Sequence, residues 1–228
     1  MQRKINFSVG EFYHIYNRGT EKRDIFIDDL DRERFLKLLY VSNGITPFVF
    51  RDFPIGLSYV DFDRGKPLVA IGAYCLMPNH FHILVREVNE GGISKFTKKL
   101  GTGYSMYFNK KYSRTGSLFE GPFKAVHVNN DEYLKYLFSY IHLNPVKNLY
   151  SDWKETNILS EVEKKKKYLD SYKYSSYLDY IGIPRKEKKL LDTEKFPEYF
   201  SLKNDFNTFI TEWLNLKNRY APGGKTTT

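Results

Sequence analysis

The predicted elements indicate an α+β fold of the ferredoxin-like, or RRM-like, type: an antiparallel sheet with helices on one face. Segments rich in β-branched and aromatic residues alternate with segments whose apolar residues recur at helical spacing. Their order is strand, helix, strand, strand, helix, strand and a further helix, and the first six match a split βαβ arrangement. A length of 228 residues with 41% hydrophobic residues is enough for one such core.

The first half of the chain predicts two strands around a helix. Residues 11–17 are aromatic and β-branched and predict a strand, which Arg18-Gly19 closes. Apolar residues at helical spacing predict an amphipathic helix over 30–41. Residues 43–66 contain repeated Gly and Pro and predict a loop or insertion with little regular structure. The apolar run 67–77 is short for a buried helix and rich in β-formers, so a strand is preferred.

The next elements continue the pattern. Pro78-Asn79 predicts a turn, which joins two strands in a tight hairpin. Gly101 and Gly103 weaken the following helix locally. Asn129 or Asn130 can cap the last helix of this region, and Pro145 ends it. The predicted segments are a strand over 80–85, a helix over 93–111, a loop over 116–121, a strand over 123–128 and a helix over 131–143.

We expect residues 1–150 to form the catalytic domain and residues 151–220 a helical C-terminal extension packed on it. The tail 221–228 is expected to be disordered. The run 161–167 contains four consecutive lysines, which are most often a solvated helix face. The alternative is a basic and aromatic binding surface, because tyrosines follow the run at positions 168, 172, 174 and 177.

Composition narrows the function classes. The net charge is +9 and 17% of the residues are aromatic, which suits a nucleic-acid partner; a basic enzyme without such a partner is the alternative. The single cysteine, Cys75, excludes a disulfide scaffold and a cysteine-based zinc site. The sequence shows no apolar run as long as a membrane span and no signal peptide at its start, so we expect a cytoplasmic protein without a membrane partner.

A His-x-His motif is the first candidate site. Residues two apart on a strand project from the same face, so His80 and His82 point the same way and Phe81 points to the other face. Two imidazoles on one face can share a divalent metal. The alternative is a pair of histidines in ordinary hydrogen bonds.

The second candidate lies on the helix predicted over 131–143. Tyr140 and Asn144 are four residues apart and therefore share a helix face. If they face a metal held by His80 and His82, the amide oxygen completes a three-ligand site with open positions for phosphate oxygens. In a chain with 19 tyrosines, a core role for Tyr140 is the alternative.

Several motifs in the same order resemble those of the single-tyrosine transposases with a His-hydrophobe-His motif, the IS200/IS605-like family. Met77–His82 and Tyr140–Lys147 are similar to the family in general. Phe12–Gly19, Gly116–Gly121 and Tyr174–Tyr177 resemble its subgroup of REP-associated tyrosine transposases. The resemblance covers roughly residues 10–180. One departure is Pro122, where many relatives have a basic residue, and this puts one DNA contact in doubt.

The resemblance implies a role for each matching residue. Tyr140 would be the nucleophile, in preference to Tyr133 and Tyr136 on the same helix. His80, His82 and Asn144 would bind Mg²⁺ or Mn²⁺, with Asn144 in the place of a residue that is Gln in some members. The enzyme would cleave and rejoin single-stranded DNA beside hairpins through a 5′-phosphotyrosine, as a monomer or a homodimer, in a prokaryotic cytoplasm and on the nucleoid.

Six side chains are candidates for DNA contacts. His14 has three alternatives: a partner behind the metal ligands, a DNA contact or a core histidine. For Arg18 the alternative is a surface salt bridge. The full set is His14, Arg18, Lys98, Lys99, Lys110 and Lys124.

Two other functions stay open at this point. One is a non-catalytic module of the same fold that binds single-stranded DNA or RNA. The other is a nicking enzyme of the replication-initiator or relaxase type, with the same chemistry. The presence of all four residues His80, His82, Tyr140 and Asn144 favours the enzyme over the binding module.

Overall fold

The computed structural model describes residues 5–50, 53–148, 159–200 and 203–215. The tail predicted to be disordered, 221–228, and part of the predicted extension lie outside the described residues. Within the described ranges, no helix is long and apolar enough to span a membrane.

A four-stranded antiparallel sheet forms the centre of the molecule. Its spatial order is β2-β3-β1-β4, with every neighbouring pair antiparallel. This is the split βαβ order that the sequence predicts, so the α+β fold class is confirmed. The strands are β1 (Phe12–Arg18), β2 (Val69–Met77), β3 (His80–Glu87) and β4 (Lys124–Val128).

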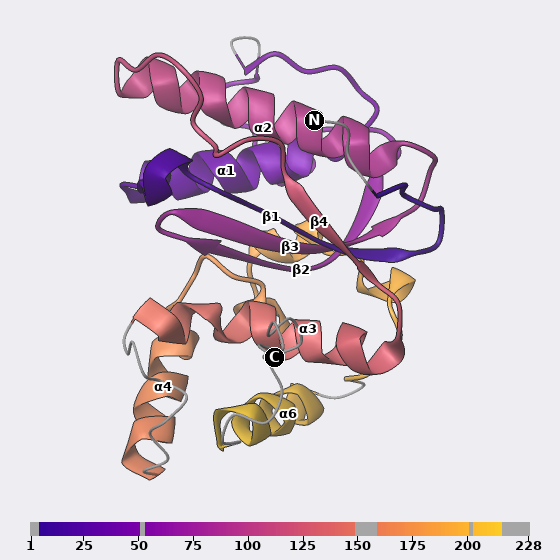
Figure 1. The fold of residues 1–228 in the computed structure, drawn as a ribbon, viewed down its shortest axis with the longest axis vertical. Coiled ribbons are helices and arrows are strands. Elements are labelled where there is room, and N and C mark those ends of the chain that lie inside the picture. The colour runs from indigo at the N-terminus through magenta and orange to yellow at the C-terminus, as the bar shows by residue number, and fades with distance from the viewer. Residues whose placement is uncertain (1–4, 51–52, 149–158, 201–202, 216–228) are drawn as a thin grey trace, which may run out of the picture.

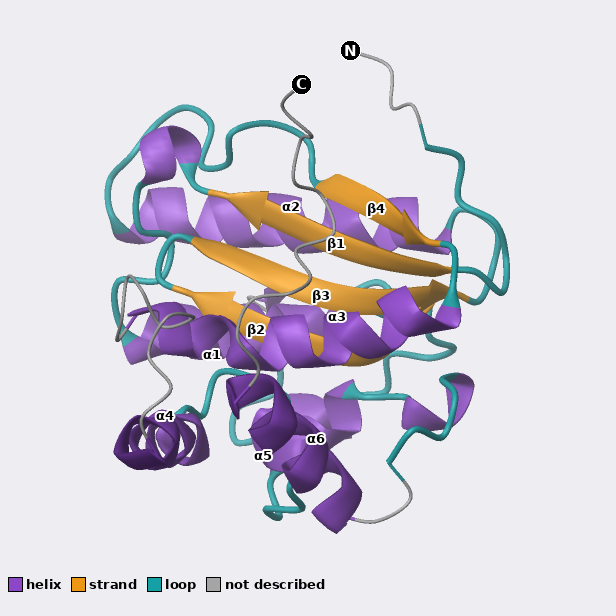
Figure 2. Cartoon of the chain, turned by 60° about the horizontal axis from the view of Figure 1, so that its bottom comes forward, coloured by secondary structure: helices purple, strands orange, loops and turns teal. Residues whose placement is uncertain are grey.

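Helices α1 (Asp29–Val41) and α2 (Gly92–Lys111) cover one face of the sheet (Figure 1). The prediction of helices on one face is confirmed for these two. The helix that carries Tyr140, α3 (Asp131–Leu143), lies along the opposite face (Figure 2). Despite its two internal glycines, α2 is continuous. Asn130 caps α3 by accepting a hydrogen bond from the Tyr133 backbone at 2.7 Å.

Alternating strand residues divide the apolar core into two clusters, one on each face of the sheet. Ile83 and Val85 of β3 belong to the cluster under α1 and α2. Leu84, between them, belongs to the cluster under α3. His80 and His82 have the parity of Leu84, so the two histidines lie on the α3 face.

Apolar residues of the described C-terminal region pack against the same face, and one of its segments closes an edge of the sheet. The segment 174–176 runs beside β2, where the Leu76 amide donates to the Tyr174 carbonyl and the Ser176 amide donates to the Tyr74 carbonyl, both at 3.0 Å. An edge strand covered in this way is protected from pairing with other chains. The late tyrosine-serine motif thus has a structural role; the division at residue 150 stays a prediction.

The remaining helices are α4 (Leu159–Ser171), α5 (Tyr177–Tyr180) and α6 (Lys203–Asn215). Short 3₁₀ turns span Thr20–Lys22, Tyr59–Asp61, Asn144–Asn148, Lys186–Leu190 and Thr193–Lys195. On α4, Lys164 and Lys167 are exposed, as a solvated face requires, but Lys165 is buried.

Candidate active site on the α3 face of the sheet

Three histidines lie together on the α3 face. His80 and His82 lie at the start of β3, with their ring centroids 5.0 Å apart. His14 comes from the neighbouring strand β1, and its ring stacks on that of His82 at 5.0 Å. His14 and His82 are 6% and 5% exposed, and His80 is half-buried. The pairing of β1 with β3 therefore adds a third imidazole to the predicted pair.

Hydrogen bonds define which ring nitrogens remain free. His80 Nδ1 lies 2.6 Å from the Asn79 Oδ1 atom, and Asn79 donates through Nδ2 to the Lys22 carbonyl. The amide oxygen of Asn79 can only accept, so His80 carries its proton on Nδ1 and its Nε2 keeps a lone pair. His82 Nδ1 lies 2.9 Å from His14 Nε2. When His82 donates in this pair, its Nε2 also keeps a lone pair.

The three histidines are neutral at pH 7. Burial lowers the pKa of His14 and of His80 to about 4. Burial also lowers the pKa of His82 well below its usual range, and the neighbouring imidazoles and Lys147 lower it further. A neutral imidazole is the form that binds a metal, because binding requires the ring lone pair.

Tyr140 lies edge-on to these rings. Its ring centroid is 5.4 Å from that of His82 and 5.8 Å from that of His14, with nearly perpendicular planes. Burial raises the pKa of the Tyr140 phenol, and a hydrogen bond with the Asn144 side chain acts in the opposite direction. Tyr140 thus lies beside the histidines of its own chain.

Asn144 lies directly after α3, at the start of a 3₁₀ turn, and is fully buried. Its Nδ2 donates to the Tyr140 carbonyl at 2.8 Å. That bond fixes the orientation of the amide, and the Oδ1 atom accepts from Lys147 Nζ at 2.8 Å. An amide oxygen has two lone pairs, so one remains for another partner.

The two rival tyrosines lie farther from this group. Tyr133 and Tyr136 stack on each other with centroids 6.2 Å apart. The Tyr136 ring also packs on Trp213 of α6, at 5.3 Å. Of the three tyrosines compared on α3, Tyr140 is therefore the one beside the histidines.

The sequence prediction missed two residues of this site. The Nζ atom of Lys147 lies 4.5 Å from the centroid of the Tyr140 ring. Tyr16 lies on β1 with its ring 5.9 Å from that of His82. Tyr16 could have been found, since it is two residues from His14 and therefore on the same strand face. Lys147 lies beyond the end of α3, so helical spacing could not predict where its side chain points.

The predicted DNA contacts are distributed over both faces of the sheet. Arg18 pairs with His80 in the strand register, and Lys124 pairs with Tyr16, so both lie on the histidine face. The lysines of α2 lie on the other face, and Lys99 donates to the Gly44 carbonyl at 2.6 Å. Of the three alternatives for His14, its buried position agrees with a side chain that supports the metal ligands from behind. That these side chains contact DNA stays a prediction.

The histidine pair and Asn144 fit a divalent metal. His80 Nε2 carries a lone pair, and His82 Nε2 carries one when His82 donates to His14. Asn144 adds an amide oxygen. Within the described residues, no group of three or more His, Cys, Asp or Glu side chains is arranged to hold a metal ion. The predicted ligands His80, His82 and Asn144 differ from such a group because Asn144 is an amide.

Residues 66–144 match the family described as IS200-like transposases. The similarity to this family is thus limited to one segment of the chain. The resemblance drawn from the sequence motifs is confirmed for this segment, which is about a third of the chain and includes His80, His82, Tyr140 and Asn144. The narrower REP-associated subgroup stays a prediction.

The similarities to solved structures extend over most of the chain and are weak. A solved REP-associated tyrosine transposase bound to a REP hairpin is 13% identical, with a TM-score of 0.48, over 82% of this chain and 90% of that one. The tRNA(His) guanylyltransferase of Saccharomyces cerevisiae is 10% identical, with a TM-score of 0.37, over 97% of this chain and 85% of that one. Neither similarity indicates a function for this chain. No curated protein matches it.

Proposed function

We propose that the protein is a metal-dependent tyrosine transposase that cleaves and rejoins single-stranded DNA at hairpin-associated sites. The observation that carries the proposal is the position of Tyr140, whose ring centroid lies 5.4 Å from that of His82. A tyrosine and two neutral imidazoles on one sheet face are the groups that phosphodiester cleavage through a covalent intermediate requires.

The reaction begins at the Tyr140 hydroxyl. Its oxygen attacks the phosphorus of a phosphodiester, an O–P bond forms, and the bond from phosphorus to the 3′-oxygen breaks. The phenol loses its proton and the leaving 3′-oxygen gains one. The products are a 5′-phosphotyrosine and a free 3′-hydroxyl. Because one phosphodiester replaces another, a 3′-hydroxyl can attack the intermediate and rejoin the strands.

A phenol with a pKa of ~10 must be activated before it can attack a phosphodiester. Burial raises the pKa of Tyr140 and makes its deprotonation harder. Lys147 places a positive charge beside the phenol ring. Arg18 lies at the end of β1, next to His80, where it can contact a phosphate. His80, His82 and Asn144 would hold Mg²⁺ or Mn²⁺, which supplies a Lewis acid for the phosphate charge.

A covalent-adduct assay tests this function. The protein is mixed with labelled single-stranded hairpins from the flanks of its own gene, with Mn²⁺ or Mg²⁺, and run on a denaturing gel. We expect a slow-moving adduct that is lost with EDTA and with Tyr140→Phe. The matched control is Tyr136→Phe, one helical turn away, which should keep the adduct.

The outcomes separate the candidate functions. An adduct that survives in Tyr140→Phe would move the nucleophile to another residue. Binding of the hairpins without any adduct, also with a pool of random flanks, would favour the non-catalytic binding module.

A further inference from the structure

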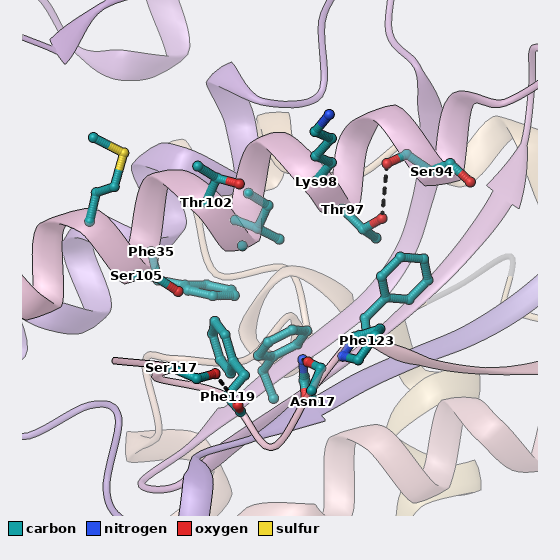
Figure 3. Close-up of a pocket in the computed structure, with 16 residues that line it drawn as sticks. Asn17, Phe35, Ser94, Thr97, Lys98, Thr102, Ser105, Ser117, Phe119 and Phe123 are labelled. Carbon is teal, nitrogen blue, oxygen red and sulfur yellow. Dashed lines mark hydrogen bonds between the residues drawn. The ribbon is translucent and has the colours of Figure 1, made fainter. Parts of the chain in front are cut away.

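A cavity of about 600 Å³ lies on the face of the sheet opposite the histidines, between α2 and the loop before β4 (Figure 3). This volume is in the range of small-ligand sites, about 300–1,000 Å³. Aromatic rings form part of its wall, and hydroxyl groups of α2 form another part. The residues that line it include Phe81, Phe119, Phe123, Thr102, Ser105 and Lys98.

The cavity lies directly behind the candidate active site. Phe81 stands between His80 and His82 in β3, and its ring projects to the opposite face, where it lines the cavity. The end of β1 repeats this arrangement, because Asn17 lines the cavity while Arg18 lies beside His80. One sheet thickness therefore separates the cavity from the histidines.

Backbone hydrogen bonds join the cavity wall to that strand end. The Glu120 amide donates to the Arg18 carbonyl at 3.0 Å, and the Thr20 amide donates to the Leu118 carbonyl at 3.0 Å. The Asn17 side chain donates to the Gly121 carbonyl at 3.0 Å. The loop before β4 is therefore fixed to the end of β1, close to Arg18.

Gly101 in the middle of α2 is not explained by packing within the protein. A glycine inside a helix costs about 1 kcal/mol relative to alanine. At Gly103 packing explains the residue, because an added Cβ would lie 2.8 Å from a Leu38 methyl group. At Gly101 an added Cβ would meet no atom within 4 Å, although the residue lines the cavity. Close approach of a ligand to the helix backbone would explain it.

We propose that this cavity binds one unpaired base of the single-stranded DNA, an inference that rests on the proposed function. A base presents two flat faces and a polar edge, which match the rings of Phe119 and Phe123 and the hydroxyls of Thr102 and Ser105. Lys98 is exposed at the cavity and supplies a cation for the adjoining phosphate. The base is held behind the sheet while the scissile phosphate lies on the histidine side.

The first test is photocrosslinking of the full chain. The probe is a pool of hairpins with random single-stranded flanks in which 5-iodouracil replaces thymine, and crosslinked peptides are identified by mass spectrometry. We expect crosslinks to Phe119 or Phe123. Crosslinks confined to other peptides would overturn the proposal. Free deoxynucleoside monophosphates that compete with the probe as well as the strand does would also overturn it.

The second test fills the cavity. Gly101→Phe should weaken single-strand binding by about fivefold to a hundredfold, the range of one base stack. The matched control is Lys95→Phe, which places the same ring at an exposed position of α2 outside the cavity lining. Lys95→Phe should bind single-stranded DNA within about twofold of the wild type, apart from the change in salt dependence caused by the loss of one positive charge. Gly101→Ala separates packing from binding, since it should keep or raise the melting temperature.

These readouts separate this inference from the proposed function. If the Tyr140 adduct forms but Gly101→Phe binds as well as the wild type, the cavity proposal fails alone. If crosslinks map to the cavity but no adduct forms, the proposed function fails alone. If the wild type binds no single-stranded DNA, both fail.

Discussion

The Nε2 atom of His14 lies 2.9 Å from the Nδ1 atom of His82, so neighbouring strands present these imidazoles as a hydrogen-bonded pair. The bond occupies Nδ1 of His82, so only its Nε2 remains available to another partner. A partner of this kind fixes the orientation and tautomer of a metal-binding histidine. The relationship makes His14 part of the site that the His-x-His motif begins.

His14→Phe should therefore act through the metal. We expect the Mn²⁺ concentration for half-maximal adduct formation to rise by about 10–100-fold, the usual effect of losing such a partner. His14→Gln, which can still hydrogen bond, should recover part of the loss. DNA affinity measured without metal should stay unchanged. A fall in that affinity with unaltered Mn²⁺ dependence would instead make His14 a DNA contact.

Lys147 should assist deprotonation of Tyr140. Its ammonium lies 4.5 Å from the phenol ring centroid, and a positive charge at this distance favours the phenolate. Lys147→Met should slow adduct formation at pH 7 severalfold, because the phenolate loses its neighbouring positive charge. The rate should recover as the pH is raised, and Lys147→Arg should stay close to the wild type. An unchanged pH profile in Lys147→Met would limit this lysine to packing.

The buried histidines should make stability depend on pH. Burial lowers the pKa of His14 and of His80 to about 4, and that of His142 to about 3. In the unfolded chain the pKa is about 6.5, so at intermediate pH the unfolded state binds more protons. The contribution to stability is fully present above pH ~6.5 and is lost as the pH falls toward the folded values.

The melting temperature of the metal-free protein should accordingly decrease between pH ~6.5 and ~4.5. His14→Phe should reduce the slope in this range, because one of the titrating groups is gone. Mn²⁺ should shift the decrease to lower pH, since bound imidazoles resist protonation. A flat melting temperature across this range would contradict the buried, neutral state of these rings.

Arg18 and Lys99 should differ in their effect on DNA binding. Arg18 lies beside His80, whereas Lys99 lies on the other face and donates to the Gly44 carbonyl. Arg18→Gln should reduce the log–log salt slope of single-strand binding by about 0.7, the value for one phosphate contact. Lys99→Gln should leave the slope unchanged. Equal slopes for Arg18→Gln and the wild type would assign Arg18 to a surface role.

Local periodicity explains how much of the site could be predicted. The period of two in a strand places His80 and His82 on one face, and the period of a helix places Asn144 one turn from Tyr140. The same patterns predicted the six elements of the sheet domain, and the helix over 131–143 agrees with α3 at both ends. These relationships involve neighbours in the chain, so composition and spacing are sufficient to find them.

Contacts between distant segments depended on the tertiary structure. His14 and His82 are 68 residues apart, and only the register of β1 against β3 brings their rings together. The segment 174–176 closes the edge of β2 through backbone hydrogen bonds and the Ser176 hydroxyl, which accepts from the Tyr74 amide at 2.9 Å. The cavity around Gly101 forms where α2, β3 and the loop before β4 converge. Residue spacing along one element cannot show which other element packs against it, because that depends on the whole core.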